Sequence, residues 1–195
     1  MVLLSGFFIA HHVLLMSDQI TVIDNALDEK DYKQLEYAIR SHEFPWYFGP
    51  SLNFNGDNSS LIDSSSRAAH KSDNHFFHEL FTVEDGIKNH FTRDLLFPAI
   101  KSIGVQVPFR VKANCNILTS NPRSDLVYHI DNPYKGTKTS ILYFDDCNGY
   151  TLFKDSQKKV TSKRNRLVTF PSNTYHTGVP QTDTQRRILV NINYI

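Results

Sequence analysis

His129 and Asp131 stand two residues apart in the stretch YHIDNP, at residues 128–133, and both side-chain types bind metals. In an extended strand, residues i and i+2 point to the same face, so this imidazole and carboxylate can reach one ion together. Two imidazoles and one carboxylate hold Fe(II) without a thiolate and leave coordination positions open. The pair is therefore interpreted as two ligands of an iron site, although a hydrogen-bonded pair at a strand end would have the same sequence.

A third ligand is predicted at His176, in the stretch FPSNTYHTGVP. This histidine follows RNRLVTF, whose β-branched and aromatic residues favour a strand, and it precedes the turn-like TGVP. The chain between His129 and His176 is long enough for several hairpins to bring the two together. Taken alone, His176 has the alternative interpretation of a hydrogen-bonded histidine at a strand edge.

The final stretch, RRILVNINYI, alternates two kinds of side chain. One face carries the apolar residues expected to pack on helices, and the other faces the interior of the barrel: Ile188, Val190 and Ile192, against Arg187, Leu189, Asn191 and Asn193. An arginine buried at the head of such a strand needs a carboxylate partner, and the only acidic residue nearby in sequence is Asp183. A small dicarboxylate co-substrate would provide that partner through a bidentate pair.

Composition narrows the class of protein. The 195 residues suit one domain, with 40% hydrophobic and 21% charged residues, as in ordinary globular proteins. A net charge of +1 gives no reason to expect nucleic acid or an anionic membrane as a partner. The two cysteines, Cys115 and Cys147, form no CxxC, which makes a thiolate zinc site unexpected. They are interpreted as thiols in a reducing compartment, hence a cytoplasmic protein.

The first residues, MVLLSGFFIAHHVLLM, are apolar but fall short of the roughly 20 residues that span a bilayer. No Lys or Arg precedes Lys30, as a secretory signal would require, and Met16 opens a natural-looking start. We expect residues 1–15 to be either a non-native upstream extension or a weak apolar leader, without stable membrane association. Residues 16–195 are expected to form a single domain.

The order of predicted elements indicates an α+β protein. A strand is predicted at residues 19–27, a helix after it with Asp28 as N-cap, and a short strand at residues 46–49. Residues 49–74 are rich in Ser, Asn, Gly and Asp and are expected to form a long loop, either a substrate lid or an ordinary surface loop. Helical periodicity covers residues 83–103, and Pro98 is expected to kink or split this helix. Short strands then follow, including one over residues 125–131. Helical support is therefore expected over residues 26–103 and a β-sandwich over residues 104–195.

The motifs together resemble a known family. The set HID, ILYFDDCNGYTLFKD, NRLVTFPSNTYHTGVP and RRILVNINY is similar to the 2-oxoglutarate/Fe(II)-dependent dioxygenases, in their prolyl 4-hydroxylase-like branch. The resemblance covers residues 107–195 and implies a double-stranded β-helix, or jelly-roll, with supporting N-terminal helices. It implies iron ligands at His129, Asp131 and His176, and 2-oxoglutarate binding by Tyr143 and by Arg187 or Arg186.

The choice between the two arginines stays open at this stage. Strand phase favours Arg187, whereas spacing from the distal histidine slightly favours Arg186. Asn114 and Asn116, on an earlier predicted strand, are further candidates for the same interior. Leu189 departs from the serine found at its position in some branches of the family. The arginine-rich final motif of the nucleobase-repair branch is absent from the sequence.

The resemblance implies hydroxylation of an unactivated C–H bond, with release of succinate and CO2 and with ascorbate as a supporting reductant. Peptidyl proline is the substrate that it favours, while another protein side chain, a free amino acid or a small metabolite stays open. One alternative is a cupin-type metal dioxygenase that does not use 2-oxoglutarate, which the terminal arginine pair disfavours. The other is a non-catalytic jelly-roll binding protein, which the complete ligand set disfavours.

Overall fold

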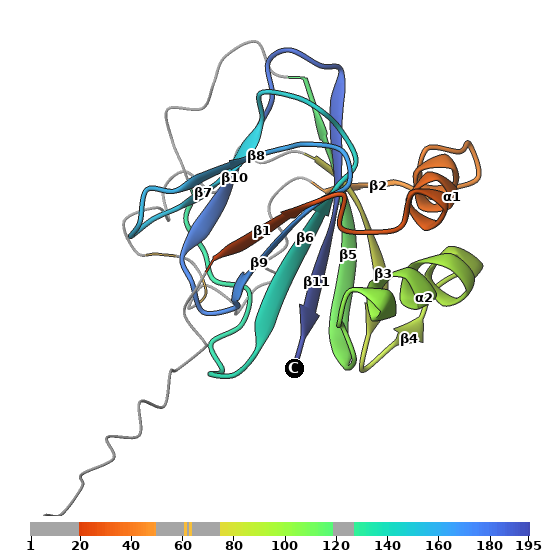
Figure 1. Ribbon diagram of the computed structural model, residues 1–195, viewed down its shortest axis with the longest axis horizontal. Coiled ribbons are helices and arrows are strands. Elements are labelled where there is room, and N and C mark those ends of the chain that lie inside the picture. The colour runs from red at the N-terminus through yellow and green to blue at the C-terminus, as the bar shows by residue number, and fades with distance from the viewer. Residues whose placement is uncertain (1–19, 50–60, 62, 64–74, 119–126) are drawn as a thin grey trace, which may run out of the picture.

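Two antiparallel sheets pack against each other in the computed structural model, which describes residues 20–49, 61, 63, 75–118 and 127–195 (Figure 1). The larger sheet has eight strands in the order β1-β9-β6-β11-β5-β3-β2, with β4 paired to β3, and the smaller has the order β10-β7-β8. The larger sheet contains β1 (Thr21–Asp24), β2 (Tyr47–Gly49), β3 (His75–Thr82), β4 (Gly86–Ile87), β5 (Pro108–Ile117), β6 (Lys138–Tyr143), β9 (Arg166–Pro171) and β11 (Arg186–Tyr194). The smaller contains β7 (Tyr150–Phe153), β8 (Lys159–Thr161) and β10 (His176–Val179). This arrangement is a jelly-roll.

The helices cover the outer face of the larger sheet (Figure 1). Helix α1 (Glu29–Ile39) begins after Asp28, whose carboxylate accepts a hydrogen bond from the Lys30 amide at 2.9 Å. This is the predicted N-cap, which satisfies one of the free amides of the first turn. Leu35 and Ile39 are buried on the face of α1 that meets the sheet.

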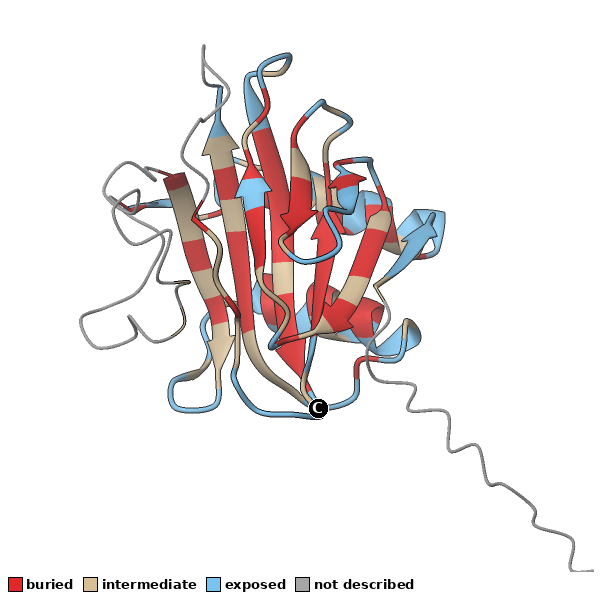
Figure 2. Ribbon diagram, turned by 90° about the vertical axis from the view of Figure 1, so that its left-hand side faces the viewer, coloured by how far each residue is buried: buried red, intermediate tan, exposed pale blue. Residues whose placement is uncertain are grey.

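The outer face of the sheet carries the main hydrophobic core. Ile188, Val190 and Ile192 of β11 belong to it together with residues of both helices, as the alternation of the last strand predicted. Full burial of each such side chain stabilises the fold by about 1.5–3 kcal/mol. Buried positions alternate with half-buried ones along several strands of the sheet (Figure 2).

The inner face of the sheet packs on the smaller sheet through a second, smaller cluster. Its buried residues are Ile141, Tyr143, Phe153, Val160, Val168, Phe170 and Leu189. Polar residues surround this cluster, and the candidate site lies among them. The two faces of one sheet therefore have different composition.

The helix predicted over residues 83–103 is wrong in its first half. Residues 83–87 form a turn and β4, which pairs with β3, and Gly86 takes a positive φ of 73° there. Ile87 and Phe91 are spaced as on one face of a helix, which explains the wrong prediction. Residues 86–87 form a strand because they pair with β3. Helical backbone begins at η3 (Phe91–Leu96), a π-helix, and continues as α2 (Phe97–Ser102).

Pro98 lies in the first turn of α2, directly after the change from π to α geometry, and the helical backbone is not split there. Its ring nitrogen cannot donate a hydrogen bond, which is tolerated in a first turn and disrupts the middle of a longer helix. The position of Pro98 at the start of α2 therefore agrees with the chemistry of proline.

The expected separation into helical support at residues 26–103 and strands at residues 104–195 also needs correction. Strands β2, β3 and β4 lie in the first segment, and β2 and β3 extend the larger sheet beyond β5. No separate strand was predicted over residues 75–82, because the sequence HFFHELFT does not alternate cleanly. Pairing with β5, interrupted by an irregularity between Glu79 and Phe81, defines it as a strand.

Two sequence-based expectations fall on residues that the structure does not describe. The apolar segment of residues 1–15 lies outside the described residues, as does nearly all of the proposed lid at residues 49–74, apart from Gly49, Leu61 and Asp63. Among the described residues, no helix has the length and hydropathy needed to cross a membrane.

Candidate metal and co-substrate site

The two histidines of the predicted triad are paired through their backbones. His176 is the first residue of β10, and the His129 amide donates to its carbonyl at 3.0 Å while the His176 amide donates back at 2.9 Å. The strand predicted over residues 125–131 is reduced, within the part that the structure describes, to this single bridge. The Asp131 amide donates to the Ser172 carbonyl at 2.9 Å, which fixes the backbone two residues further on.

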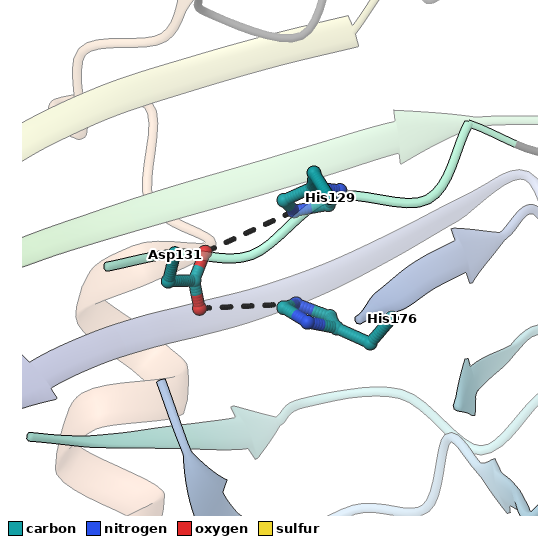
Figure 3. Close-up of side chains that lie close together, drawn as sticks. All are labelled: His129, Asp131 and His176. Carbon is teal, nitrogen blue, oxygen red and sulfur yellow. Dashed lines mark ion pairs between the residues drawn. The ribbon is translucent and has the colours of Figure 1, made fainter. Parts of the chain in front are cut away.

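All three side chains converge on one point (Figure 3). Nε2 of His129 lies 3.8 Å from Oδ1 of Asp131, and Nε2 of His176 lies 3.8 Å from Oδ2. The three ligand atoms are within 4.8 Å of one another. Because 3.8 Å is too long for a hydrogen bond, these atoms do not satisfy each other directly, and a cation between them would contact all three. The residues present therefore fit an iron(II) ion.

Neighbouring polar groups orient two of the three ligands. Nδ1 of His176 lies 3.0 Å from the carbonyl oxygen of Thr174, which places its proton there and leaves Nε2 free to bind a metal. Oδ2 of Asp131 accepts a hydrogen bond from Oγ1 of Thr139 at 2.8 Å, and the amides of Asn191 and Asn193 lie 3.4 Å from it. Of these partners, Thr139 was missed in the sequence, although the alternation of the last strand placed both asparagines on the inner face.

The protonation states also suit metal binding. Burial, and to a smaller extent the nearby His176, lower the pKa of His129 to about 4, so its imidazole is neutral at pH 7. Burial alone would raise the pKa of Asp131, but the two histidines and the Thr139 hydroxyl outweigh burial and hold that pKa below its ordinary value. A neutral imidazole and an ionised carboxylate are the forms that coordinate metals.

Arg187 forms a second, separate feature on the inner face. Its side chain is 2% exposed, whereas Arg186 is exposed on the other face of β11. The guanidinium donates to the Val179 carbonyl, but its Nε has no hydrogen-bond partner, and none of the ion pairs among the described residues includes it. Burial lowers the pKa of Arg187, which expresses the cost of this cation without an anion. A carboxylate at this position would accept hydrogen bonds from the guanidinium and neutralise its charge.

The wall around Arg187 is closely fitted. A Cβ on Gly149 would lie 2.7 Å from Nη1 and 2.9 Å from Cδ of Arg187, so only glycine leaves room for this side chain. Tyr143 is fully buried, and its hydroxyl lies 2.7 Å from Oγ1 of Thr151. Burial raises the pKa of Tyr143, against the opposing charge of Arg187. Tyr143 therefore remains a neutral hydrogen-bonding group near the guanidinium.

The two asparagines of β5 share the inner face with these residues. Asn114 is opposite Leu189 and Asn116 is opposite Arg187 in the register of β5 with β11. Directly opposed residues in an antiparallel pair point to the same side of the sheet. The structure thus brings together His129, Asp131 and His176 at one end and Arg187, Tyr143 and Asn116 at the other, and it separates Arg186 from both.

No family model and no curated protein matches the sequence. Solved structures do share the fold. An oxidoreductase of the 2OG-Fe(II) oxygenase family from Burkholderia pseudomallei has a TM-score of 0.61 at 9% identity, over 90% of this chain and 84% of that one. A non-heme alpha-ketoglutarate-dependent carbocyclase from nogalamycin biosynthesis has a TM-score of 0.58 at 11% identity, over 91% and 79%.

A prolyl hydroxylase from Trichoplax adhaerens, solved with a peptide fragment of hypoxia inducible factor, has a TM-score of 0.52 at 16% identity, over 90% and 83%. At these identities the similarity establishes the fold, which is the jelly-roll fold of 2-oxoglutarate oxygenases.

Proposed function

We propose that this protein is an Fe(II)- and 2-oxoglutarate-dependent oxygenase that hydroxylates an unactivated C–H bond and releases succinate and CO2. One observation carries the proposal: the half-buried His129 and Asp131 and the buried His176 lie against the inner face of the larger sheet, and this face also carries Arg187, a buried cation with no carboxylate partner among the described residues. The fold, which such oxygenases share, supports it.

In this proposal each residue has a specific task. His129, Asp131 and His176 bind iron on one side and leave positions for exchangeable ligands. Arg187 binds the far carboxylate of 2-oxoglutarate, and Tyr143 supplies a neutral donor beside it. Thr139 and Thr174 keep the ligands oriented through their hydrogen bonds. When bound, iron and 2-oxoglutarate supply the oxidising chemistry, and ascorbate would keep the metal reduced.

The substrate is not determined by the fold. Peptidyl proline is one candidate, because a prolyl hydroxylase is among the structures with this fold, but so is a carbocyclase. The cytoplasm is the proposed compartment, and both cysteines are free thiols, as a reducing environment would leave them.

The test measures metal binding and turnover separately. Purified protein should bind Mn(II) as a stand-in for Fe(II) and should then bind 2-oxoglutarate, both detectable by anaerobic calorimetry. With Fe(II), 2-oxoglutarate, ascorbate and O2, slow succinate release should appear even without the substrate. Asp131→Ala should abolish both, whereas Asp155→Ala, which removes an exposed carboxylate, should change neither.

The competing functions give different results in the same assay. A cupin-type dioxygenase would bind the metal and ignore 2-oxoglutarate. A non-catalytic binding protein would release no succinate under any condition. Either result in the unmodified protein would overturn the proposal.

A further inference from the structure

Lys112 is a second buried cation on the inner face, and no role has yet been assigned to it. Its side chain is 7% exposed, at the middle of β5. In the sheet it lies opposite Asn191 on one side and Glu79 on the other. The amide of Asn191 is 3.4 Å from the Asp131 carboxylate, so Lys112 lies one strand away from the metal triad.

The nearest acid on the same face is already engaged. Glu79 accepts two hydrogen bonds from Arg110, at 2.7 and 3.2 Å, which is a bidentate pair. Across the described residues, no carboxylate forms an ion pair with Lys112, and its Nζ lies instead 4.7 Å from the centre of the Phe77 ring. Burying an ammonium without an anion is costly, and a single aromatic face compensates only part of that cost.

The charges of Lys112 and of the metal triad, which lies one strand away, affect each other. Burial and, less strongly, Arg110 lower the pKa of Lys112 to about 7, against the opposing charges of Glu79 and Asp131. The charge of Lys112 in turn adds to the lowering of the pKa of His129, for which burial and His176 are the larger causes. Lys112 therefore interacts electrostatically with both His129 and Asp131.

Lys112 is distinct from the position of Arg187. Arg187 lies opposite Asn116, four residues beyond Lys112 on the same strand, which is about 13 Å along β5. The inner face thus has two buried cations, one at each end of the site, and neither has a carboxylate among the described residues. If Arg187 binds the far carboxylate of 2-oxoglutarate, a different carboxylate is needed at Lys112.

We propose that Lys112 binds a carboxylate of the hydroxylated substrate, which is therefore a compact carboxylic acid of the free amino acid type, with its apolar part against Phe77. This inference rests on the proposed function. A peptidyl proline would bring only neutral amides to this position and would leave the ammonium without an anion. The other source of a carboxylate is the keto-acid end of 2-oxoglutarate itself, and the experiment separates the two.

The first arm measures co-substrate binding. In the Mn(II)-loaded protein, Lys112→Met should change the 2-oxoglutarate dissociation constant less than twofold, whereas Arg187→Met should raise it at least tenfold. An equal loss in both variants would overturn the proposal, because Lys112 would then serve 2-oxoglutarate. If the unmodified protein binds neither Mn(II) nor 2-oxoglutarate, the proposed function itself fails, which is a separate result.

The second arm measures substrate binding without turnover. Protein loaded with Zn(II) and 2-oxoglutarate is titrated with the proteinogenic L-amino acids, their primary amides and blocked proline dipeptides, observed by saturation-transfer NMR. At least one free acid should bind, its amide should not, and Lys112→Met should weaken the acid at least tenfold. Lys112→Arg should restore most of the affinity. Lys159→Met is the matched control, since Lys159 also lies over an aromatic ring but is exposed.

Three outcomes of the second arm would overturn the proposal. They are binding of no free acid, equal binding of an acid and its amide, and binding of the blocked dipeptides alone. Retained 2-oxoglutarate affinity in Lys112→Met shows that this variant is folded, so a loss in the second arm cannot be attributed to unfolding.

Discussion

The side chains on the two faces of β11 contact different kinds of group. On the outer face, Ile188, Val190 and Ile192 are enclosed by helices and by neighbouring strands. On the inner face, Arg187 is equally buried but forms no ion pair with any described carboxylate, and the amides of Asn191 and Asn193 lie near the Asp131 carboxylate. One face of this strand therefore stabilises the fold through apolar packing. The other face presents polar groups that could bind a metal or a co-substrate. Substitutions on the two faces should affect different measurements.

The largest expected effect is on the inner side, at the metal. Asp131→Ala should reduce succinate release at least a thousandfold, because two histidines alone hold iron poorly and in no fixed geometry. Its free energy of unfolding, measured by urea titration of the metal-free protein, should fall far less than in the outer-face variant below. A comparable loss of stability would mean that the two faces are not functionally separate.

The outer face should show the opposite pattern. Ile192→Ala removes a fully buried side chain and should lower the free energy of unfolding by about 3 to 4 kcal/mol. Urea titration gives this value, and calorimetry on the folded protein should give an unchanged Mn(II) dissociation constant. Weakened metal binding in the folded variant would show that the outer core also adjusts the site.

Acid should destabilise the fold through a buried histidine, the first residue of β3. His75, 3% exposed, has its pKa lowered to about 4 by burial, with a smaller effect of Lys112, against 6.5 in the unfolded chain. The unfolded state therefore takes up a proton first, and stability present above pH 6.5 is lost as the pH falls toward 4. Between pH 7 and pH 4.5 this loss is about 2.5 kcal/mol. In metal-free His75→Leu, the free energy of unfolding from urea titrations should fall by that much less between pH 7 and pH 4.5. If it falls as much as in the unmodified protein, His75 is not the cause of the acid sensitivity.

The smallest expected effect concerns the wall behind Arg187. Gly149→Ala would place a methyl group 2.7 Å from Nη1, so the guanidinium must shift, and 2-oxoglutarate affinity should fall about tenfold with Mn(II) affinity unchanged. Gly178→Ala is the matched control, because its Cβ would lie at an ordinary 3.5 Å from Nη2. If both variants bind 2-oxoglutarate equally well, the close contact between Gly149 and Arg187 does not affect co-substrate binding.

Much of this contrast could be predicted from the sequence. Period-two alternation separated Arg187 and the asparagines from the isoleucines, and the N-cap of α1 followed from local chemistry. These features depend on neighbours in sequence, where pattern is most reliable. The ligand triad was assembled from two separate motifs and a resemblance, and its three members do converge.

Other features could not be predicted, because they depend on partners that are distant in the sequence. Strand β3 exists because it pairs with β5, and HFFHELFT alone does not indicate it. His129 is held by one bridge to His176, not by a regular strand. Lys112 looked like any polar residue in a strand, since only the three-dimensional structure reveals that Glu79 is bound to Arg110 instead. Long-range pairing, not local propensity, decides all three.

The bridge between His129 and His176 has a consequence for how the metal enters the protein. It closes a long loop that contains β6, β7, β8 and β9, and the entropy of closing that loop is lost when the sheets form. A metal ion added later joins two residues that are already adjacent, so it has little chain left to order. Protein backbone atoms alone therefore hold two of the metal ligands side by side, and metal binding would order little further chain.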